Sequence, residues 1–430
     1  IPKQFKKFTK YFFVSGMALN VPKWLDEQFL SYCLNEGKDC EEKRVQSFNV
    51  SSAVPQGLNY CSLLFRVKTE YRKKDEDIVH CSSLIVKEPI ENTSADYAQT
   101  EPKFYNEFLP AALEISSSIK FAPNTYFSTI PDVVVMEDLC QGGYKMADKR
   151  ELLDFDHCML YAIASATFHA VSVAVHKKQP KLVESFGPDK FFTNQKYMAG
   201  LKNLFIGGLN NMAEKMRLFD DYKQYADDLR SSTTTIWNMA VDALKPSSPF
   251  NTLSQGDAWT GNMMFKYDES GKVCDIKLLD FQGVRYACLL GDMIFFIYTS
   301  ANYDVRENRM HDLYRVYCDT INAKLEEYEC PERLTFEQLL ENVTRLSSKA
   351  LLVAATSYPI IRSTKYVDTS AIMFGEVDDS VITHAFDQYY DEDYCEKHLP
   401  RVLKQLNTAG SFDYVVTRLR TTYIEKIVGN

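Results

Sequence analysis

Three polar side chains in the stretch Leu253–Gln282 have the types and spacing needed to bind a divalent cation and activate a hydroxyl. Asp257 and Asn262 lie five residues apart, and Asp280 follows eighteen residues after Asn262. Carboxylate and amide oxygens are the ligands that Mg²⁺ takes in phosphoryl-transfer sites, where substrate phosphates complete its coordination. A separate carboxylate orients the attacking hydroxyl there. We therefore expect Asn262 and Asp280 to hold Mg²⁺ and Asp257 to act on the acceptor.

The elements that must position these residues form a hairpin. Two apolar runs, Met263–Phe265 and Val273–Leu279, are separated by the turn-forming residues Asp268-Glu269-Ser270-Gly271. Such a pattern predicts strand, turn and strand. The returning strand would bring Asp280 beside Asn262. The pair Asp257 and Asn262 alone is not specific, because a polar loop beside a core hairpin would contain such a pair often.

A longer motif makes the prediction specific. The matching residues are Gly256, Asp257, Trp259, Asn262 and Phe265, followed by Asp280-Phe281-Gln282. This pattern resembles the insect ecdysteroid-kinase-like (CHK kinase-like) family, relatives of choline and aminoglycoside kinases, whose motif is His-Gly-Asp-x-Trp-x-x-Asn-x-x-Phe and then Asp-Phe-Gln. The sequence departs from it at Gln255, which replaces the histidine. The resemblance extends over about residues 20–420.

The resemblance implies an α+β, bilobal protein-kinase-like fold. It also implies that the protein uses ATP and Mg²⁺ as cofactors. The N-lobe would hold an antiparallel sheet with a helix, and the larger C-lobe would be mostly helical. Amphipathic patterns at 151–175, 221–243, 308–328 and 334–357 agree with a helical C-lobe. We expect an N-terminal extension at 1–16, a nucleotide-binding N-lobe at 17–139, and a C-lobe with catalytic loop and acceptor pocket at 140–430.

Nucleotide-binding residues in the N-lobe are also implied by the resemblance. Gly57 and Asn59 belong to a segment similar to the family's loop over the nucleotide, and the backbone of Glu137 to Leu139 would read the adenine edge. By position alone, Lys87 at the end of an apolar run favours the rim of a sheet. In the kinase fold this lysine instead binds phosphates and pairs with a glutamate, for which we select Glu101 rather than Glu107.

Composition restricts the partners and the compartment. The 430 residues carry a net charge of -9, which argues against nucleic acid as the main partner. Eleven scattered cysteines without a Cys-x-x-Cys pair fit reduced thiols, so we expect a cytoplasmic protein. The most apolar stretch, Met159–Val175, contains His169 and small polar residues and predicts a buried core helix rather than a membrane span.

Three classes of function remain: a small-molecule kinase, a pseudokinase and a protein kinase. A protein kinase is disfavoured because the short interval from Asp280 to Asp292 leaves no room for an activation segment. Gln255 is the feature that favours a pseudokinase, but the residues for metal and hydroxyl are present, so we favour an active enzyme. We expect Asp292 to be a helix N-cap or a support for the catalytic loop, and His169 to be structural.

The acceptor is predicted from the resemblance rather than from individual residues. It implies a hydroxyl on a lipophilic small molecule: an ecdysteroid-like steroid or a foreign alcohol, phenol or glycoside. The acidic run Asp387–Glu396 offers carboxylates for a cationic acceptor, but charge runs are usually solvated surface. We therefore expect no activity on choline or kanamycin. We also expect no obligate protein partner, since no feature of the sequence indicates one.

Overall fold

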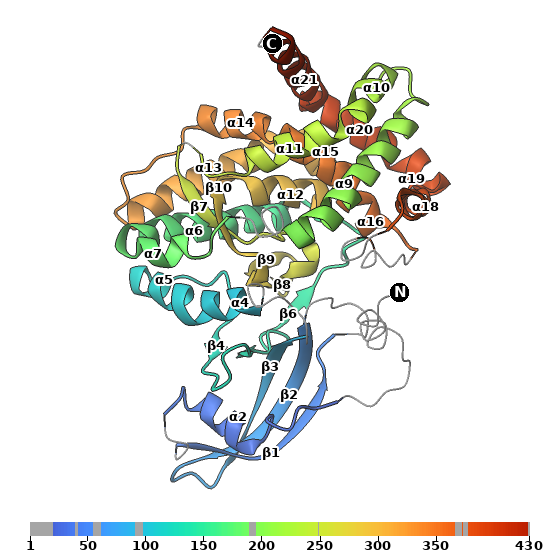
Figure 1. Cartoon of the computed structure of the whole chain (residues 1–430). Coiled ribbons are helices and arrows are strands. Elements are labelled where there is room, and N and C mark those ends of the chain that lie inside the picture. The colour runs from blue at the N-terminus through green and yellow to red at the C-terminus, as the bar shows by residue number, and fades with distance from the viewer. Residues whose placement is uncertain are drawn as a thin grey trace. The chain divides into compact units, whose positions relative to one another are not determined.

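The structure is a computed structural model that describes residues 20–38, 42–54, 62–90, 98–188, 195–247, 249–365, 372 and 377–428. The chain divides into two compact units. Unit 1 contains residues 1–106 and 122–144, and unit 2 contains residues 107–121 and 145–430. Figure 1 shows their elements, coloured along the chain.

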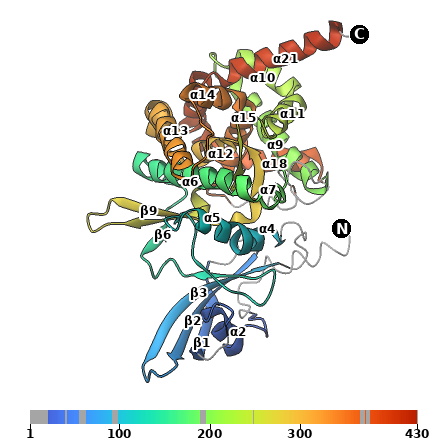
Figure 2. The same ribbon diagram turned by 90° about the vertical axis from the view of Figure 1, so that its left-hand side faces the viewer.

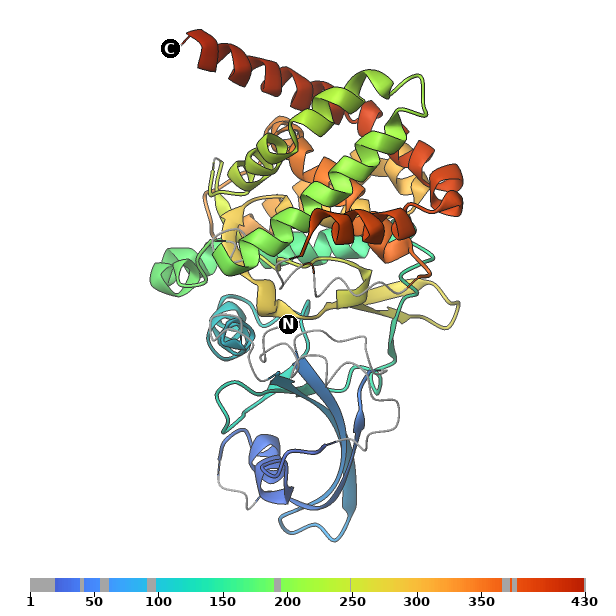
Figure 3. The ribbon, with the colours of Figure 1, turned by 45° about the vertical axis from the view of Figure 1, so that its right-hand side comes forward.

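Unit 1 is built on a five-stranded antiparallel sheet. Its strands are β1 (Lys43–Ser52), β2 (Ser62–Lys73), β3 (Val79–Pro89), β4 (Thr125–Tyr126) and β5 (Val134–Glu137), in the order β1-β2-β3-β5-β4. The long β2–β3 hairpin is blue in Figure 3. The predicted antiparallel N-terminal sheet is therefore confirmed.

A helix near the start of the described chain packs against the core of unit 1. α2 (Glu27–Leu34) begins at Asp26, whose side chain accepts a hydrogen bond from the N–H of Phe29 at 2.8 Å. Its apolar face buries Phe29, Leu30 and Cys33 against sheet residues that include Phe65 and Val86. The rest of the core comes from alternate positions of the strands, as expected for a sheet covered on one face.

Unit 2 is mostly helical, as predicted (Figure 2). Its helices are α5 (Leu109–Ile115), α6 (Phe155–Lys178), α7 (Pro180–Glu184), α9 (Gln195–Met216), α10 (Lys223–Ser231), α11 (Thr233–Ala243), α12 (Gly291–Ser300), α13 (Met310–Glu327), α14 (Phe336–Arg345), α15 (Ser347–Ala355), α16 (Ser357–Arg362), α18 (Asp379–Tyr389), α19 (Glu392–Lys397), α20 (Leu399–Thr408) and α21 (Ser411–Val428). Short α4 (Thr100–Lys103) and the π-helical turn Phe104–Phe108 precede α5.

Residues 107–121 belong to unit 2, which the predicted boundary at residue 139 did not anticipate. The physical reason is aromatic packing. Phe108 packs edge-on against Phe168 with ring centroids 5.8 Å apart, and Phe121 lies 5.2 Å from the same ring. The N–H of Leu278 also donates to the carbonyl of Phe121 at 2.7 Å. The predicted extension at 1–16 lies outside the described residues.

α6 is the central helix of unit 2. It is long and apolar enough to cross a membrane, but 78% of its most apolar window is buried inside the protein, where it packs along α13. The prediction of a buried core helix over Met159–Val175 is confirmed. The nine described cysteines are all free thiols. A cytoplasmic location stays a prediction.

Two small sheets support the loops of unit 2. β7 (Asn251–Ser254) pairs antiparallel with β10 (Arg285–Cys288). β8 (Met263–Tyr267) and β9 (Val273–Leu278) form the predicted hairpin, yellow in Figure 3, which continues to β6 (Tyr144–Met146). Its turn is closed by Asp268, whose Oδ1 accepts from the N–H groups of Ser270 and Lys272.

Candidate active site

The loop that carries Asp257 leaves β7 directly beside the segment that enters β10. Gly256 has φ +95°, a conformation that side chains rarely adopt. A Cβ on Gly256 would also lie 2.1 Å from the carbonyl oxygen of Gly283. A glycine is therefore required by both backbone conformation and space, and it allows the Asp257 loop to lie against the Asp280-Phe281-Gln282 segment.

The hairpin brings the two expected metal ligands to one end. Met263 of β8 pairs with Leu278 of β9, and the N–H of Leu279 donates to the carbonyl of Asn262 at 2.9 Å. Asp280 is the next residue. The sequence prediction that the hairpin returns Asp280 beside Asn262 is confirmed.

Asn262 is oriented by Asp257. Its Nδ2 donates to the Oδ2 of Asp257 at 2.8 Å and to the carbonyl of Asp257 at 2.9 Å. Because both amide protons are used, Oδ1 is the atom of Asn262 that can bind a cation. The contact also fixes the carboxylate of Asp257 next to this oxygen.

Asp280 has a left-handed backbone, with φ 59° and ψ 76°. Non-glycine residues held in this region cost about 1–3 kcal/mol and cluster at functional sites. Its Oδ2 accepts a 3.3 Å hydrogen bond from Nε2 of Gln282. The side chain is half-buried, so the strained backbone keeps the carboxylate of Asp280 partly accessible beside Asn262.

The pKa of Asp257 is raised to about 6. Burial is the largest cause, followed by the negative charge of Asp280, while hydrogen bonds from Asn262 and Trp259 act in the opposite direction. The influence of Asp280 places the two carboxylates in one electrostatic site. Gly261 makes room for the Trp259 ring, because a Cβ there would lie 2.4 Å from it.

Asp292 holds the loop that leads to Asp257 by accepting hydrogen bonds from its backbone. Its Oδ2 accepts from the N–H of Gln255 at 2.5 Å, and its Oδ1 accepts from the N–H of Gly256 at 3.2 Å. The N-cap of α12 is Leu290, so the alternative that Asp292 caps this helix is wrong. The prediction that it supports the loop is confirmed.

A buried network surrounds Asp292. Arg285 Nη2 lies 3.7 Å from its Oδ1, and His169 Nε2 lies 4.0 Å from its Oδ2. Burial alone would raise the pKa of Asp292, but His169 and the charges of Arg285 and Lys349 outweigh it and lower the pKa to about 2. His169 is fully buried and its Nδ1 contacts the hydroxyl of Tyr317 at 2.6 Å, which agrees with a structural role.

Gln255 bridges the catalytic loop to the end of β9. Its Nε2 donates to the carbonyl oxygen of Leu279, the residue before Asp280. Among the described residues, its buried Oε1 has no hydrogen-bond partner. Nε2 of Gln255 thus braces the peptide that positions Asp280, whereas Oε1 does not contribute to this contact.

In unit 1, Lys87 and Glu101 form an ion pair, with 2.5 Å between Nζ and Oε2. In the sheet, Lys87 of β3 is paired with Leu64 of β2 on one side and with Val134 of β5 on the other, so its strand is central. The residue is 9% exposed. The placement at the rim, which position alone favoured, is therefore wrong. Glu101 lies on α4 and is buried, whereas Glu107 is exposed.

Backbone hydrogen bonds to neighbouring segments hold the segment Glu137–Leu139 in place. The N–H of Glu137 donates to Asn124 and that of Asp138 to Ser83, while the carbonyl of Leu139 accepts from Gly142 and Tyr144. Within the described residues, the N–H of Leu139 forms no backbone hydrogen bond. That N–H therefore keeps its hydrogen-bonding capacity. Gly57 and Asn59 lie outside the described residues.

Sequence reasoning missed the residue that anchors this segment. Asp138 is buried, accepts from Nε of Arg66 at 2.8 Å and from Oγ of Ser83 at 2.8 Å, and caps the N–H of Cys140 at 3.2 Å. Burial raises its pKa, but the bonds from Arg66 and Ser83 dominate and lower it. The available signal was an acidic residue directly after a buried strand.

The residues in unit 2 fit a small hard cation. Among the described residues, no group of three or more His, Cys, Asp or Glu side chains could hold a metal. Asn262 and Asp280 instead offer one amide oxygen and one carboxylate. When nucleotide phosphates supply part of its coordination, Mg²⁺ needs only one or two side-chain ligands from the protein.

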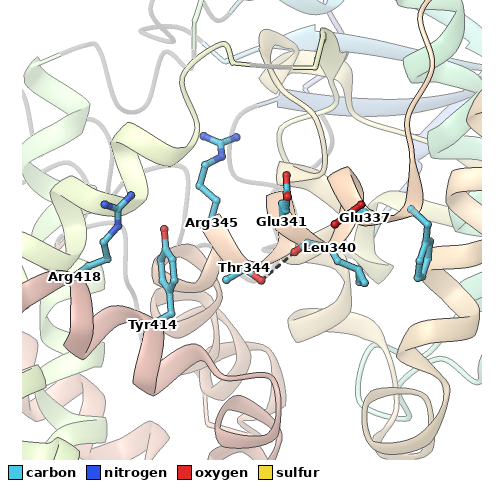
Figure 4. Close-up of a pocket in the computed structure, with 8 residues that line it drawn as sticks. Glu337, Leu340, Glu341, Thr344, Arg345, Tyr414 and Arg418 are labelled. Carbon is cyan, nitrogen blue, oxygen red and sulfur yellow. Dashed lines mark hydrogen bonds between the residues drawn. The ribbon is translucent and has the colours of Figure 1, made fainter.

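A groove lies elsewhere on unit 2, between α14 and α21 (Figure 4). Its lining includes Phe336, Leu340 and Thr344 from α14 and Tyr414 and Arg418 from α21. None of the predicted site residues lines it. The groove is therefore separate from the candidate active site.

A structure of a choline/ethanolamine kinase family protein from Mesorhizobium loti has 11% identity and a TM-score of 0.30, covering 81% of this chain and 95% of that chain. A glucosamine kinase has 13% identity and a TM-score of 0.31, covering 90% and 84%. These scores are too low to bear on fold or function, and no curated protein matches the chain. A sequence model of the ecdysteroid kinase-like family matches residues 56–330. Because that match spans more than half of the 430 residues, the chain belongs to the ecdysteroid kinase-like family.

Proposed function

We propose that this protein is an ATP- and Mg²⁺-dependent kinase that phosphorylates a hydroxyl of a lipophilic small molecule. The observation that carries the proposal is the arrangement of Asp257, Asn262 and Asp280. Asn262 gives both amide protons to Asp257 and keeps its oxygen for a cation, and the hairpin holds Asp280 next to it. Family membership agrees with a kinase.

Each residue has one role in the proposal. Asn262 and Asp280 would hold Mg²⁺, which neutralises phosphate charge during transfer. Asp257 would orient the acceptor hydroxyl and accept its proton. In unit 1, Lys87, fixed by Glu101, would bind phosphates of ATP, and the N–H of Leu139 together with the carbonyl of Glu137 would meet the adenine. Gly57 and Asn59 are proposed for the loop over the phosphates.

The enzyme is favoured over a pseudokinase because Gln255 makes a bracing contact to Leu279 in place of the family's histidine. A hydrogen bond from an amide can fulfil a bracing role without titrating. The residues assigned to metal, base and phosphate do not include Gln255. Its replacement of histidine therefore removes no proposed chemical step.

The acceptor proposal rests on the family resemblance. We propose an ecdysteroid-like steroid or a foreign alcohol, phenol or glycoside. The carboxylates of the acidic run, including Asp387, Glu392, Asp393 and Glu396, are exposed, which agrees with solvated surface rather than a buried cage for a cation.

An acceptor screen with radiolabelled ATP tests the function. Wild-type protein and the Asp280→Asn variant are incubated with Mg²⁺, ATP and either a hydroxylated steroid, a phenol, a glycoside, choline or kanamycin. We expect labelled product from at least one of the first three, none from the last two, and none from the variant. Turnover of choline or kanamycin, with the lipophilic alcohols inert, would contradict the acceptor class.

A further inference from the structure

A second cluster of polar side chains lies in unit 2, outside the residues assigned above. It is formed by Arg306, Tyr303, Tyr358, Arg362, Tyr394 and His398. Arg306 lies on the π-helical turn η4 (Val305–Arg309), Tyr358 and Arg362 on α16, and Tyr394 on α19. We call these six residues the Arg306 cluster.

Arg306 is a buried cation, and three of its five N–H donors have no hydrogen-bond partner among the described residues. It is 6% exposed, and Nη1 reaches the carbonyl of Tyr298 at 3.5 Å. Among the described residues, its Nε and Nη2 have no hydrogen-bond partner, and its guanidinium forms no ion pair with a carboxylate. Nε and Nη2 form the edge of arginine that binds a carboxylate or phosphate through two parallel hydrogen bonds.

The same edge is filled elsewhere in this chain. Arg66 uses Nε and Nη2 to bind the two oxygens of Asp138, at 2.8 and 3.4 Å. Arg309, three residues after Arg306, has its Nε paired with Asp312 at 2.6 Å. Arg306 therefore differs from these two arginines in lacking the oxygen atoms that its edge would bind.

Aromatic contacts compensate only part of the cost of burying Arg306. The guanidinium lies 4.9 Å from the ring centre of Tyr303 and 4.6 Å from that of Tyr358. Each such contact contributes up to about 2 kcal/mol when desolvated. An unpaired buried ion costs several kcal/mol. The two rings supply no oxygen acceptor, so Nε and Nη2 stay without a hydrogen-bond partner among the described residues.

Neighbouring residues add positive charge and hydrogen-bond donors. Arg362 Nη2 contacts Nε2 of His398 at 3.5 Å, and its buried Nε has no partner within the described part of the chain. The hydroxyl of Tyr394 is likewise buried and unpartnered there. The nearby acid Glu307 is already paired with Arg401 at 2.9 Å, and Asp393 with Lys397. Neither guanidinium of the cluster forms an ion pair among the described residues, although the charge of Asp393 is close enough to Arg362 to interact with it.

The outer side of the cluster consists of Tyr303 and His398, which are half-buried and in contact with each other. The hydroxyl of Tyr358 donates to that of Tyr303 at 2.8 Å. Ser300, three residues before Tyr303, accepts a hydrogen bond from the N–H of Thr260 in the loop after Asp257, at 2.9 Å. Tyr303 and Arg306 therefore come three and six residues after a residue that contacts that loop.

We propose that the Arg306 cluster is a binding site for an oxyanion, namely the carboxylate, sulfate or phosphate group of a small molecule. Nε and Nη2 of Arg306 bind two of its oxygens, and Arg362 and Tyr394 supply further donors. The site goes beyond the proposed kinase function and requires no turnover for its test. The oxyanion is either inorganic or part of an organic ligand, and the two arms below distinguish these sources.

In the first arm, thermal unfolding of the full chain is measured against sodium sulfate, with sodium chloride at equal ionic strength as reference. Sulfate stabilises proteins nonspecifically as well, so the comparison between variants decides. We expect a saturable rise of the midpoint for wild type that is lost in Arg306→Met. It should persist in Arg309→Gln, which loses an arginine already paired, and in Lys87→Met, which excludes the nucleotide phosphate site.

Calorimetry with sulfate gives the matching affinity. Loss of the two charge-assisted bonds predicts a weakening of about tenfold or more in Arg306→Met. Arg306→Lys keeps the charge but not the planar edge, so it should weaken binding as well. If Arg306→Met does not fold, the wild type and Arg306→Lys decide. An absence of saturable sulfate binding to wild type, or equal binding to every variant, overturns the proposal.

In the second arm, phenyl glucuronide is compared with phenyl glucoside, which has the same ring without the carboxylate. Tighter binding of the glucuronide than of both sulfate and the glucoside, dependent on Arg306, assigns the oxyanion to an organic ligand. Sulfate binding at least as tight as that of the glucuronide assigns it to a free inorganic ion. Glucuronide binding that is unchanged by Arg306→Met contradicts the site.

Discussion

The N–H of Gln255 donates to Oδ2 of Asp292 across 2.5 Å. The other carboxylate oxygen of Asp292 accepts from Gly256, so this side chain holds the two residues that precede Asp257. A buried carboxylate that accepts backbone hydrogen bonds is stabilised in its charged form. The position of Asp257 thus depends on the ionisation of Asp292.

This dependence predicts a specific pH profile for stability. The folded pKa of Asp292 is lowered from 3.8 to about 2. Its contribution is therefore complete above about pH 4 and is lost as pH falls toward 2, and it amounts to about 2 kcal/mol. Asp292→Asn should unfold at lower urea concentration than wild type at pH 7, and the difference should narrow between pH 4 and 2. A difference independent of pH would contradict the assignment.

Gly256→Ala should destabilise the protein by at least about 2 kcal/mol, because it adds left-handed strain and a clash with the carbonyl of Gly283. Gly271→Ala is the matched control, since Gly271 also has positive φ, of +82°, but has no atom within 4 Å of an added Cβ. It should cost only the strain, about 1 kcal/mol. Urea unfolding measures both, and equal losses would show that the close contact with Gly283 contributes nothing.

Gln255→His should fold and change turnover by no more than about tenfold, which corresponds to about 1.4 kcal/mol in the barrier. The reason is that Gln255 braces the peptide of Leu279 and touches none of the three site residues through its side-chain bonds. Steady-state kinetics of both proteins provide the measurement. An inactive wild type made active by this change would favour the pseudokinase.

Asp280→Asn should weaken the dependence of ATP binding on Mg²⁺ and nearly abolish turnover, because an amide is a poorer ligand than a carboxylate for Mg²⁺. Glu269→Gln removes one negative charge from the exposed turn of the same hairpin and is the control. Calorimetry of ATP with and without Mg²⁺ compares the variants. Full activity of Asp280→Asn would exclude Asp280 as a metal ligand.

Local patterns predicted the hairpin of β8 and β9 well. Its turn residues and flanking apolar runs set the register, so the adjacency of Asn262 and Asp280 followed from sequence. The Lys87 to Glu101 pair required the family resemblance, because an apolar run does not reveal that its strand is central in the sheet. Each of these predictions depended on residues close together in the chain or on a known motif.

Features that depend on distant packing could not be predicted. Asp138 is anchored by Arg66 and Ser83, which are 72 and 55 residues away in sequence. The predicted helix at 334–357 is divided at Leu346, although no glycine or proline marks the break, and the following helix α15 is buried on all sides. Tertiary contacts decide such positions, and a single sequence does not contain them explicitly.

The central claim is that Asp257 acts on the acceptor hydroxyl, while Asn262 and Asp280 serve the metal. The most direct measurement compares Asp257→Asn with wild type in Mg²⁺-ATP affinity and in transfer of the labelled phosphoryl group to a hydroxylated steroid. We predict affinity within about threefold of wild type, because no proposed nucleotide contact is lost, and transfer reduced by about 10²–10⁴-fold. Transfer at the wild-type rate, or a loss of affinity equal to that of Asp280→Asn, would contradict the account.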